Sequence, residues 1–100
     1  MTCRSLFALG ALLLFGSTTS GAAEDGAVLY TRRCANCHGA KGEGNSATRV
    51  PAVKGTKMDA NQLVELMTKG QSGLKAPHAR GMSRLREADA KAIAQHIKTL

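Results

Sequence analysis

Aromatic residues are scarce in this sequence. Its 100 residues include no Trp, two Phe and one Tyr. Both phenylalanines, Phe7 and Phe15, lie near the N-terminus, so Tyr30 is the only aromatic residue in the rest of the chain. A chain of this length holds at most one small domain, and without large aromatic side chains its apolar core is thin. Such a domain often needs a disulfide, a metal or a bound group to hold it together.

The apolar run near the N-terminus is too short to cross a membrane, which takes about 20 residues. This run, residues 5–16, follows a basic start and precedes small and hydroxylated residues that end at Ala23. The three parts together are typical of a secretory signal peptide. We predict a cleaved signal over residues 1–23, which removes Cys3, and a single exported domain over residues 24–100. Cleavage one residue earlier and an uncleaved N-terminal anchor are the alternatives.

The two remaining cysteines lie in the motif Arg-Cys-Ala-Asn-Cys-His-Gly, residues 33–39. Export makes a Cys34–Cys37 disulfide chemically possible. A thioredoxin-like redox site, however, needs a preceding strand within a βαβ pattern, and no alternating, strand-like run precedes this motif. A closed zinc site needs about four ligands. Two distant histidines, His78 and His96, could complete such a set, but their spacing is far too long for a zinc finger.

Cys-x-x-Cys-His is the signature of c-type haem attachment. The thiols of Cys34 and Cys37 would add to the haem vinyl groups, and His38 would become the proximal ligand of the iron. On a helical turn, a two-residue gap lets both sulfurs reach the vinyl groups while the histidine faces the metal. Combined with the export signal, the motif favours one covalent haem c and its iron over a disulfide, a zinc site or a chance match.

Apolar spacing and cap residues predict an all-α domain with three main helices. These helices are expected over residues 25–34, 60–69 and 87–100. Asp25 and Asp59 are suitable N-caps, and Gly70 is a suitable end for the middle helix. Acidic residues in the first turn of the last helix suit its dipole. Glycine-rich residues 39–55 and residues 71–83 are expected to form loops.

Further positions match one family. Gly26 and Tyr30 precede the cysteine motif at characteristic spacings, and a Pro-x-apolar-x-Gly element begins at Pro51. Through these residues, positions 25–100 resemble class I monohaem cytochromes c, especially the short bacterial periplasmic type. The resemblance implies a cytochrome c fold with loops wrapped around one haem, in which Gly26 and Tyr30 pack the first helix against the last. It also implies that the Pro51 carbonyl accepts a hydrogen bond from His38, which fixes the ring orientation.

The resemblance implies Met82 as the second axial ligand of the iron, because the family keeps its distal methionine in the loop before the last helix. Two positions depart from the family. Ser83 stands where a proline often follows the methionine, and Arg86 stands where the last helix usually has a Ser or Thr cap. His78, in the same loop, is the main alternative ligand.

Other candidates for the sixth position are weaker. Met58 lies just before a helix cap, close in sequence to the haem loop. Met67 falls on the apolar face of the predicted middle helix and is expected to fill the core. His96 takes the last-helix position where the family usually has an aromatic residue, and is expected to pack against the first helix. An open sixth position also remains.

Acidic residues are few, with 7 Asp and Glu against 14 Lys and Arg, for a formal net charge of +7. Nucleic acid is not an expected partner, because Tyr30 alone offers no stacking platform and export removes the usual target. We expect steering towards acidic patches on redox partner proteins, with a generic solvated surface as the alternative. The basic residues expected near the haem are Arg32, Arg33, Lys41, Lys54, Lys57, Lys69, Lys75, Arg80, Arg84 and Arg86.

Together these features predict a periplasmic electron-transfer protein with His38 and Met82 as axial ligands, cycling between ferrous and ferric iron. It would be a monomer or a small subunit of a redox complex, without stable membrane insertion and without an enzymatic activity of its own. The alternatives are a haem enzyme or small-ligand sensor with a labile sixth position, and the cytochrome subunit of a larger dehydrogenase.

Overall fold

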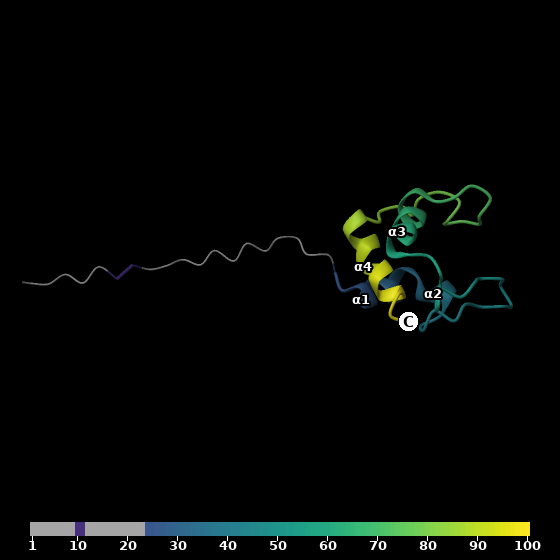
Figure 1. Ribbon diagram of the computed structural model, residues 1–100, viewed down its shortest axis with the longest axis horizontal. Helices are drawn as coiled ribbons and strands as arrows, with labels where there is room; N and C mark the ends of the chain where they lie inside the picture. Colours follow the sequence, from purple (N-terminus) through teal and green to yellow (C-terminus); the bar gives the residue numbers. More distant parts are fainter. Residues whose placement is uncertain (1–9, 12–23) are drawn as a thin grey trace, which may run out of the picture.

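The computed structural model describes residues 10–11 and 24–100 (Figure 1). The predicted signal peptide therefore lies almost wholly outside the described residues. Within those residues the chain forms four helices and no strand: α1 (Gly26–Arg33), α2 (Ala35–His38), α3 (Ala60–Lys69) and α4 (Glu87–Ile97). The predicted all-α class is confirmed, with the one-turn α2 added to the three main helices. None of these helices has the length and apolar composition needed to cross a bilayer.

Aspartate caps fix where α1 and α3 begin. The Asp25 carboxylate accepts a hydrogen bond from the Ala27 backbone N–H at 2.8 Å. At α3, Asp59 accepts from the Gln62 N–H at 2.8 Å, and the Gln62 side chain accepts from the Asp59 N–H at 2.9 Å. This capping box satisfies two N–H groups that have no partner within the helix. Gly70, with φ of 73°, ends α3 as predicted.

Two helix ends differ from the prediction. The first helix stops at Arg33, because Cys34 takes φ of −123° and ψ of −40°, and α2 then starts at Ala35. The last helix stops at Ile97 instead of continuing to Leu100. There the backbone N–H and the hydroxyl of Thr99 both donate to the His96 carbonyl, which closes the chain into a turn.

The core lies where α4 packs against both α1 and α3 (Figure 1). It consists of small and aliphatic side chains around one tyrosine: Leu29, Tyr30, Leu63, Val64, Met67, Ala90, Ile93, Ala94 and Ile97. Met67 is only 5% exposed, so its predicted role as core filler is confirmed. The alternation of small alanines with branched side chains on α4 lets two helices approach it closely.

The closest contact between α1 and α4 occurs at Gly26. A Cβ at this position would overlap the backbone carbonyl of Ala92 and would lie 3.3 Å from the His96 Cβ. One turn later, the Tyr30 ring lies 5.3 Å from the His96 ring between centroids. The Tyr30 hydroxyl donates to the Gly39 carbonyl at 2.7 Å. The packing roles expected for Gly26, Tyr30 and His96 are confirmed.

Helix α4 begins without the Ser or Thr cap usual in the family. Arg86 stands at the N-cap position, and its guanidinium donates to both carboxylate oxygens of Asp89, at 2.9 and 3.0 Å. Asp89 is buried, with 8% of its surface exposed. The Arg86 hydrogen bonds hold the pKa of the Asp89 carboxyl below its usual value. This bidentate pair joins Arg86 to the first turn of α4, just after the loop that carries Met82, although no side chain caps the first N–H groups of the helix.

We predict that Gly26→Ala destabilises the protein, although alanine is the better helix former. The new methyl group would force α1 away from α4, at a cost of roughly 1–3 kcal/mol. Urea denaturation of the haem-loaded protein measures this cost. Thr31→Ala, at an exposed position on the same helix, should change stability by less than about 0.5 kcal/mol. A Gly26→Ala variant as stable as the parent would contradict the close crossing.

A second prediction concerns Asp89. Because its folded-state pKa is lowered, its charge stabilises the fold above the unfolded pKa of about 3.9, and this contribution is lost as pH falls through the folded pKa. Wild type should therefore exceed Asp89→Asn in stability at pH 6, and the gap should close as pH falls below about 4. The urea midpoints of unfolding of both proteins, measured across this pH range, test the prediction. Glu87→Gln, on the exposed side of the same turn, is the control. A stability difference between wild type and Asp89→Asn that does not depend on pH would contradict the ionised pair.

Candidate functional site

The single turn of α2 brings the three residues of the cysteine motif together. The backbone N–H groups of Cys37 and His38 both bond to the Cys34 carbonyl, at 3.1 and 2.9 Å. Cys34 is half-buried against the core, whereas Cys37 is exposed. Both thiols are free. The turn therefore presents two thiols and one imidazole from adjacent positions, as haem attachment requires.

The orientation of His38 is fixed by Pro51. The His38 Nδ1 lies 2.8 Å from the Pro51 carbonyl oxygen, the contact that the resemblance implies. A carbonyl oxygen can only accept, so Nδ1 must carry the proton and donate. The other ring nitrogen, Nε2, then keeps its lone pair and is the atom available to a metal. Outer hydrogen bonds of this kind fix the orientation of a ligating histidine.

The loop after α2 holds Pro51 beside His38. The Gly44 N–H donates to the His38 carbonyl at 2.6 Å, and Asn45 pairs with Val50 in an isolated antiparallel bridge. Gly44 has φ of 75°, and a Cβ there would lie 2.6 Å from the Ala52 nitrogen. The two arms of the loop approach so closely that only glycine fits at this position.

The structure does not form the disulfide or the zinc site weighed from the sequence. Burial raises the pKa of the Cys34 thiol to about 11, and the neighbouring Cys37 adds to this effect while Arg33 opposes it. Redox-active Cys-x-x-Cys pairs have lowered thiol pKa values, so this environment is the opposite of theirs. Among residues 24–100, no three His, Cys, Asp or Glu side chains gather as a metal would require.

The loop that carries Met82 is pinned to the end of α3. The Met82 N–H donates to the Met67 carbonyl at 2.8 Å. A Cβ at Gly81 would overlap the Thr68 carbonyl, and one at Gly70 would lie 2.5 Å from the Arg80 Cα. The Met82 side chain is partly buried and packs against the core. The backbone just before Met82 is thus fixed by two close approaches that only glycine permits.

A second contact ties the Met82 loop to the cysteine motif. The Arg33 guanidinium donates to the Ser83 carbonyl at 2.8 Å. Arg33 directly precedes Cys34, and Ser83 directly follows Met82. From the sequence, Arg33 was predicted only as one of many surface charges. Nothing in its local sequence signals this bond, because the partner lies far along the chain.

His78 lies beside His38. The centroids of the two rings are 5.9 Å apart, with 44° between the ring planes. The His78 Nδ1 is buried and has no hydrogen-bond partner. Burial lowers the pKa of the His78 imidazole, and the neighbouring His38 lowers it further. The side chain is therefore neutral near pH 7, the form that binds metals.

The remaining candidates lie elsewhere. Met58 is partly buried against the core, and the Lys98 ammonium donates to its carbonyl at 2.9 Å. His96 packs on Tyr30 at the crossing of α1 and α4. The structure thus brings Pro51 and His78, from two different loops, beside the helical turn of Cys34, Cys37 and His38. Met82 lies on the same loop as His78, where its backbone N–H is bonded to the Met67 carbonyl.

These residues fit a covalently bound haem. Two free thiols and an imidazole with an available Nε2 occupy one helical turn, which matches the donor set of c-type attachment. The buried, unpartnered Nδ1 of His78 next to them is unusual, since buried polar atoms nearly always have a partner. Cys34 and Cys37 would hold the porphyrin, and His38 would hold the iron.

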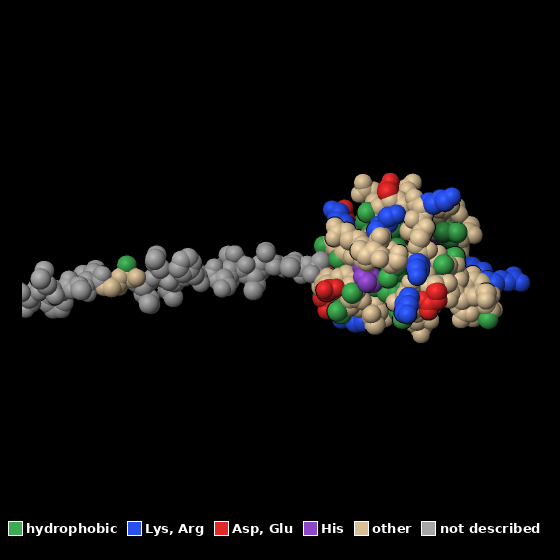
Figure 2. Space-filling model, turned by 60° about the horizontal axis from the view of Figure 1, so that its bottom comes forward, with side chains coloured by type: hydrophobic (Ala, Val, Ile, Leu, Met, Phe, Trp, Pro, Cys, Tyr) green, Lys and Arg blue, Asp and Glu red, His purple; other side chains and the backbone are tan. Residues whose placement is uncertain are grey.

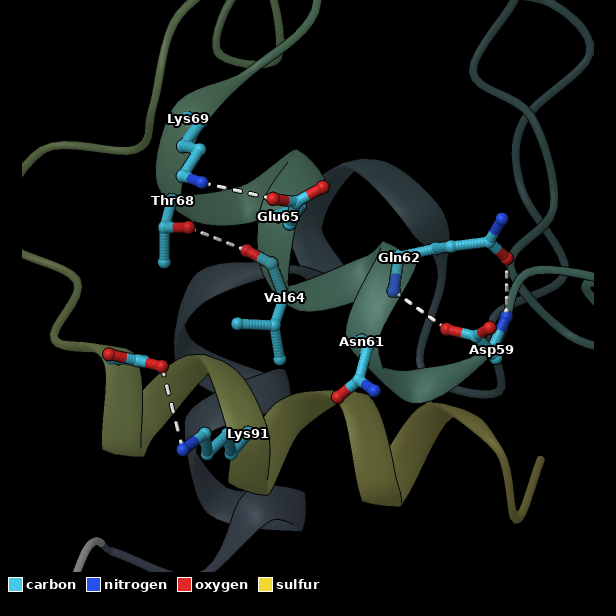
Figure 3. A pocket seen from close by; sticks show the side chains of 9 residues that line it. Asp59, Asn61, Gln62, Val64, Glu65, Thr68, Lys69 and Lys91 are labelled. Carbon is cyan, nitrogen blue, oxygen red and sulfur yellow. Dashed lines mark hydrogen bonds and ion pairs between the residues drawn. The ribbon is translucent and has the colours of Figure 1, made fainter.

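A separate groove of about 460 Å³ lies between α3 and α4 (Figure 3). Its walls carry ion pairs along each helix, Lys69 with Glu65 at 2.9 Å and Lys91 with Glu87 at 3.5 Å. All four side chains are exposed, so these pairs are screened by solvent. None of the predicted ligands of haem lines this groove, and its ion-paired side chains are exposed to solvent.

Basic side chains are spread widely over the domain. Figure 2 shows Lys and Arg distributed across one face, with fewer acidic side chains between them. All ten basic residues predicted to lie near the haem are exposed, and Arg80 and Arg84 flank Met82. The charge is therefore accessible to a partner approaching the Met82 loop.

The chain was compared with known protein families. Residues 21–97 match the family described as cytochrome c oxidase, cbb3-type, subunit III. A search of curated proteins gave no match.

Proposed function

The chain belongs to this family of cytochrome c domains, and on that basis we propose that it carries electrons between redox proteins with His38 and Met82 as axial ligands. Family membership confirms the predicted c-type cytochrome domain with covalently bound haem c and iron. Bound haem supplies the redox change, as its iron cycles between the ferrous and ferric states. The protein supplies attachment, ligand orientation and exclusion of water.

The observation that carries this proposal is the hydrogen bond from His38 Nδ1 to the Pro51 carbonyl, 2.8 Å long. It leaves Nε2 as the free ligand atom and prevents the ring from rotating. A fixed ligand changes little between oxidation states, which suits repeated electron transfer. The bond also supports Pro51 as the residue that positions His38 in the working protein.

Two restraints support Met82 as the sixth ligand. Its backbone is bonded to Met67 at the end of α3, and Arg33 holds the following residue, Ser83. A loop restrained in this way would keep the thioether close to the iron. Methionine–histidine ligation raises the reduction potential.

Export to the periplasm is part of this proposal. Its support is the signal-like pattern of residues 1–23 together with haem attachment, which in bacteria takes place beyond the cytoplasmic membrane. The domain over residues 24–100 would be the mature protein. Its partners would be redox proteins with acidic docking patches, which the exposed arginines and lysines would attract.

A second candidate function is the electron-transfer subunit of a larger enzyme complex. The description of the matched family, which names a subunit of an oxidase, favours it. Size-exclusion chromatography of native extracts separates the two roles. A free carrier elutes at the size of a small domain, whereas a subunit elutes with its complex.

The axial ligand assignment predicts the spectrum of Met82→Leu. The wild type should be low-spin in both oxidation states, with a far-red methionine-to-ferric-iron band and no shift on addition of carbon monoxide. The variant should lose that band, and its reduction potential should fall by on the order of 0.1 V, since axial ligands set potentials over about 0.8 V. Met58→Leu is the matched control and should keep the band. A band that persists in Met82→Leu would refute the assignment.

The basic surface predicts a salt dependence. The rate of electron exchange with an acidic redox partner should fall about tenfold as salt rises from low to physiological concentration. Arg80→Gln with Arg84→Gln should lower both the rate and its dependence on salt. Lys91→Gln, whose side chain pairs with Glu87 on α4, is the matched control and should change both much less. A rate independent of salt would exclude steering by these charges.

A further inference from the structure

The His38 and His78 rings have a spacing that suits two ligands of one metal. Metal–nitrogen bonds to histidine are about 2 Å long, so two imidazoles on opposite sides of one ion have centroids roughly 6 Å apart. The observed separation is 5.9 Å. His38 presents Nε2 for binding because Nδ1 is engaged with Pro51.

The surroundings of His78 leave its side chain available. Its backbone is held in the loop, where the His78 carbonyl accepts from the Gln71 N–H at 2.8 Å and its N–H donates to Lys75 at 2.9 Å. The ring, by contrast, is partly buried, and its Nδ1 has no partner. The loop thus fixes the position of His78 while its imidazole remains without a hydrogen bond. A surface histidine with only a solvation role would not show this combination.

His78 and Met82 lie on the same loop, which is pinned at Gly70, Gly81 and Ser83. One sixth position on the iron can accept only one of them. We propose that His78 is a second distal ligand that replaces the Met82 thioether on a fraction of the ferric iron. This proposal rests on the proposed function, with His38 and Met82 as the axial pair.

The exchange is favoured by the different preferences of the two ligands. The soft thioether stabilises ferrous iron, which is why methionine ligation raises the potential, whereas imidazole is the harder ligand. Oxidation therefore shifts the balance from Met82 towards His78, and by linkage His78 binding lowers the potential. Both ligands are neutral, so the exchange itself moves neither a proton nor an electron. The electron leaves to the redox partner, as in the proposed function.

The experiment compares haem-loaded Met82→Ala with the double variant Met82→Ala/His78→Ala. In ferric Met82→Ala, His78 should fill the sixth position, so the spectrum should stay low-spin. Added imidazole should bind at least about tenfold more weakly than to the double variant, because it must displace His78. Met82→Leu with His78→Gln repeats the comparison with side chains of closer volume, and far-UV circular dichroism checks that each variant keeps its helices.

Equal imidazole affinity in the single and double variants would overturn the proposal. The loss of the far-red band in Met82→Ala would in that case still support Met82 as the resident ligand. If instead His78→Ala removes the low-spin spectrum of the wild type, the assignment of Met82 and the exchange both fail.

The wild type provides a second readout. Electron paramagnetic resonance of the ferric protein should show a second low-spin species that disappears in His78→Ala. It should persist in His96→Ala, the matched control, because His96 packs on Tyr30. If the wild type, His78→Ala and His96→Ala all show one and the same low-spin species, the proposed ligand exchange is overturned.

Discussion

The packing of α4 against both α1 and α3 is the constraint on which the rest of the structure depends. It is possible because Gly26 presents no side chain to the Ala92 carbonyl, and because alanines on α4 leave room for the neighbouring helices. The crossing of α1 and α4 sets the position of α2, the single turn that follows α1 and carries His38. It also sets the end of α3, onto which the Met82 loop is bonded. With Tyr30 as the only aromatic residue of the core, few large side chains could compensate for a looser crossing.

Two polar bonds then connect distant segments around His38. The Pro51 carbonyl accepts from the imidazole, and the Arg33 guanidinium reaches the carbonyl of Ser83. One bond determines which histidine nitrogen is free, and the other joins the cysteine motif to the distal loop. A small domain with a thin core can position ligands in this way because each bond fixes a backbone segment as well as a side chain.

The distal loop offers two kinds of ligand within a short length of chain. His78 lies beside His38, and Met82 packs against the core, held through its backbone. Neither position alone determines which group binds the iron in each oxidation state. Iron ligation by either side chain would depend on the loop remaining bonded to α3 and to Arg33. The exposed arginines around Met82 place the positive charge beside this loop, where a redox partner would approach.

The sequence by itself determined the local features. It predicted the helices, the aspartate caps, the cysteine motif and the role of Met67, because these depend on neighbouring residues and on helical periodicity. The resemblance added the contact of Pro51 with His38. Only the tertiary structure placed His78 beside His38 and joined Arg33 to Ser83. The structure also paired Arg86 with Asp89 at the start of α4. The Arg86–Asp89 pair has the i,i+3 spacing of a helix and could have been anticipated from the sequence. The other two join segments far apart in the chain, and their proximity follows from how α4 holds α1 and α3 together.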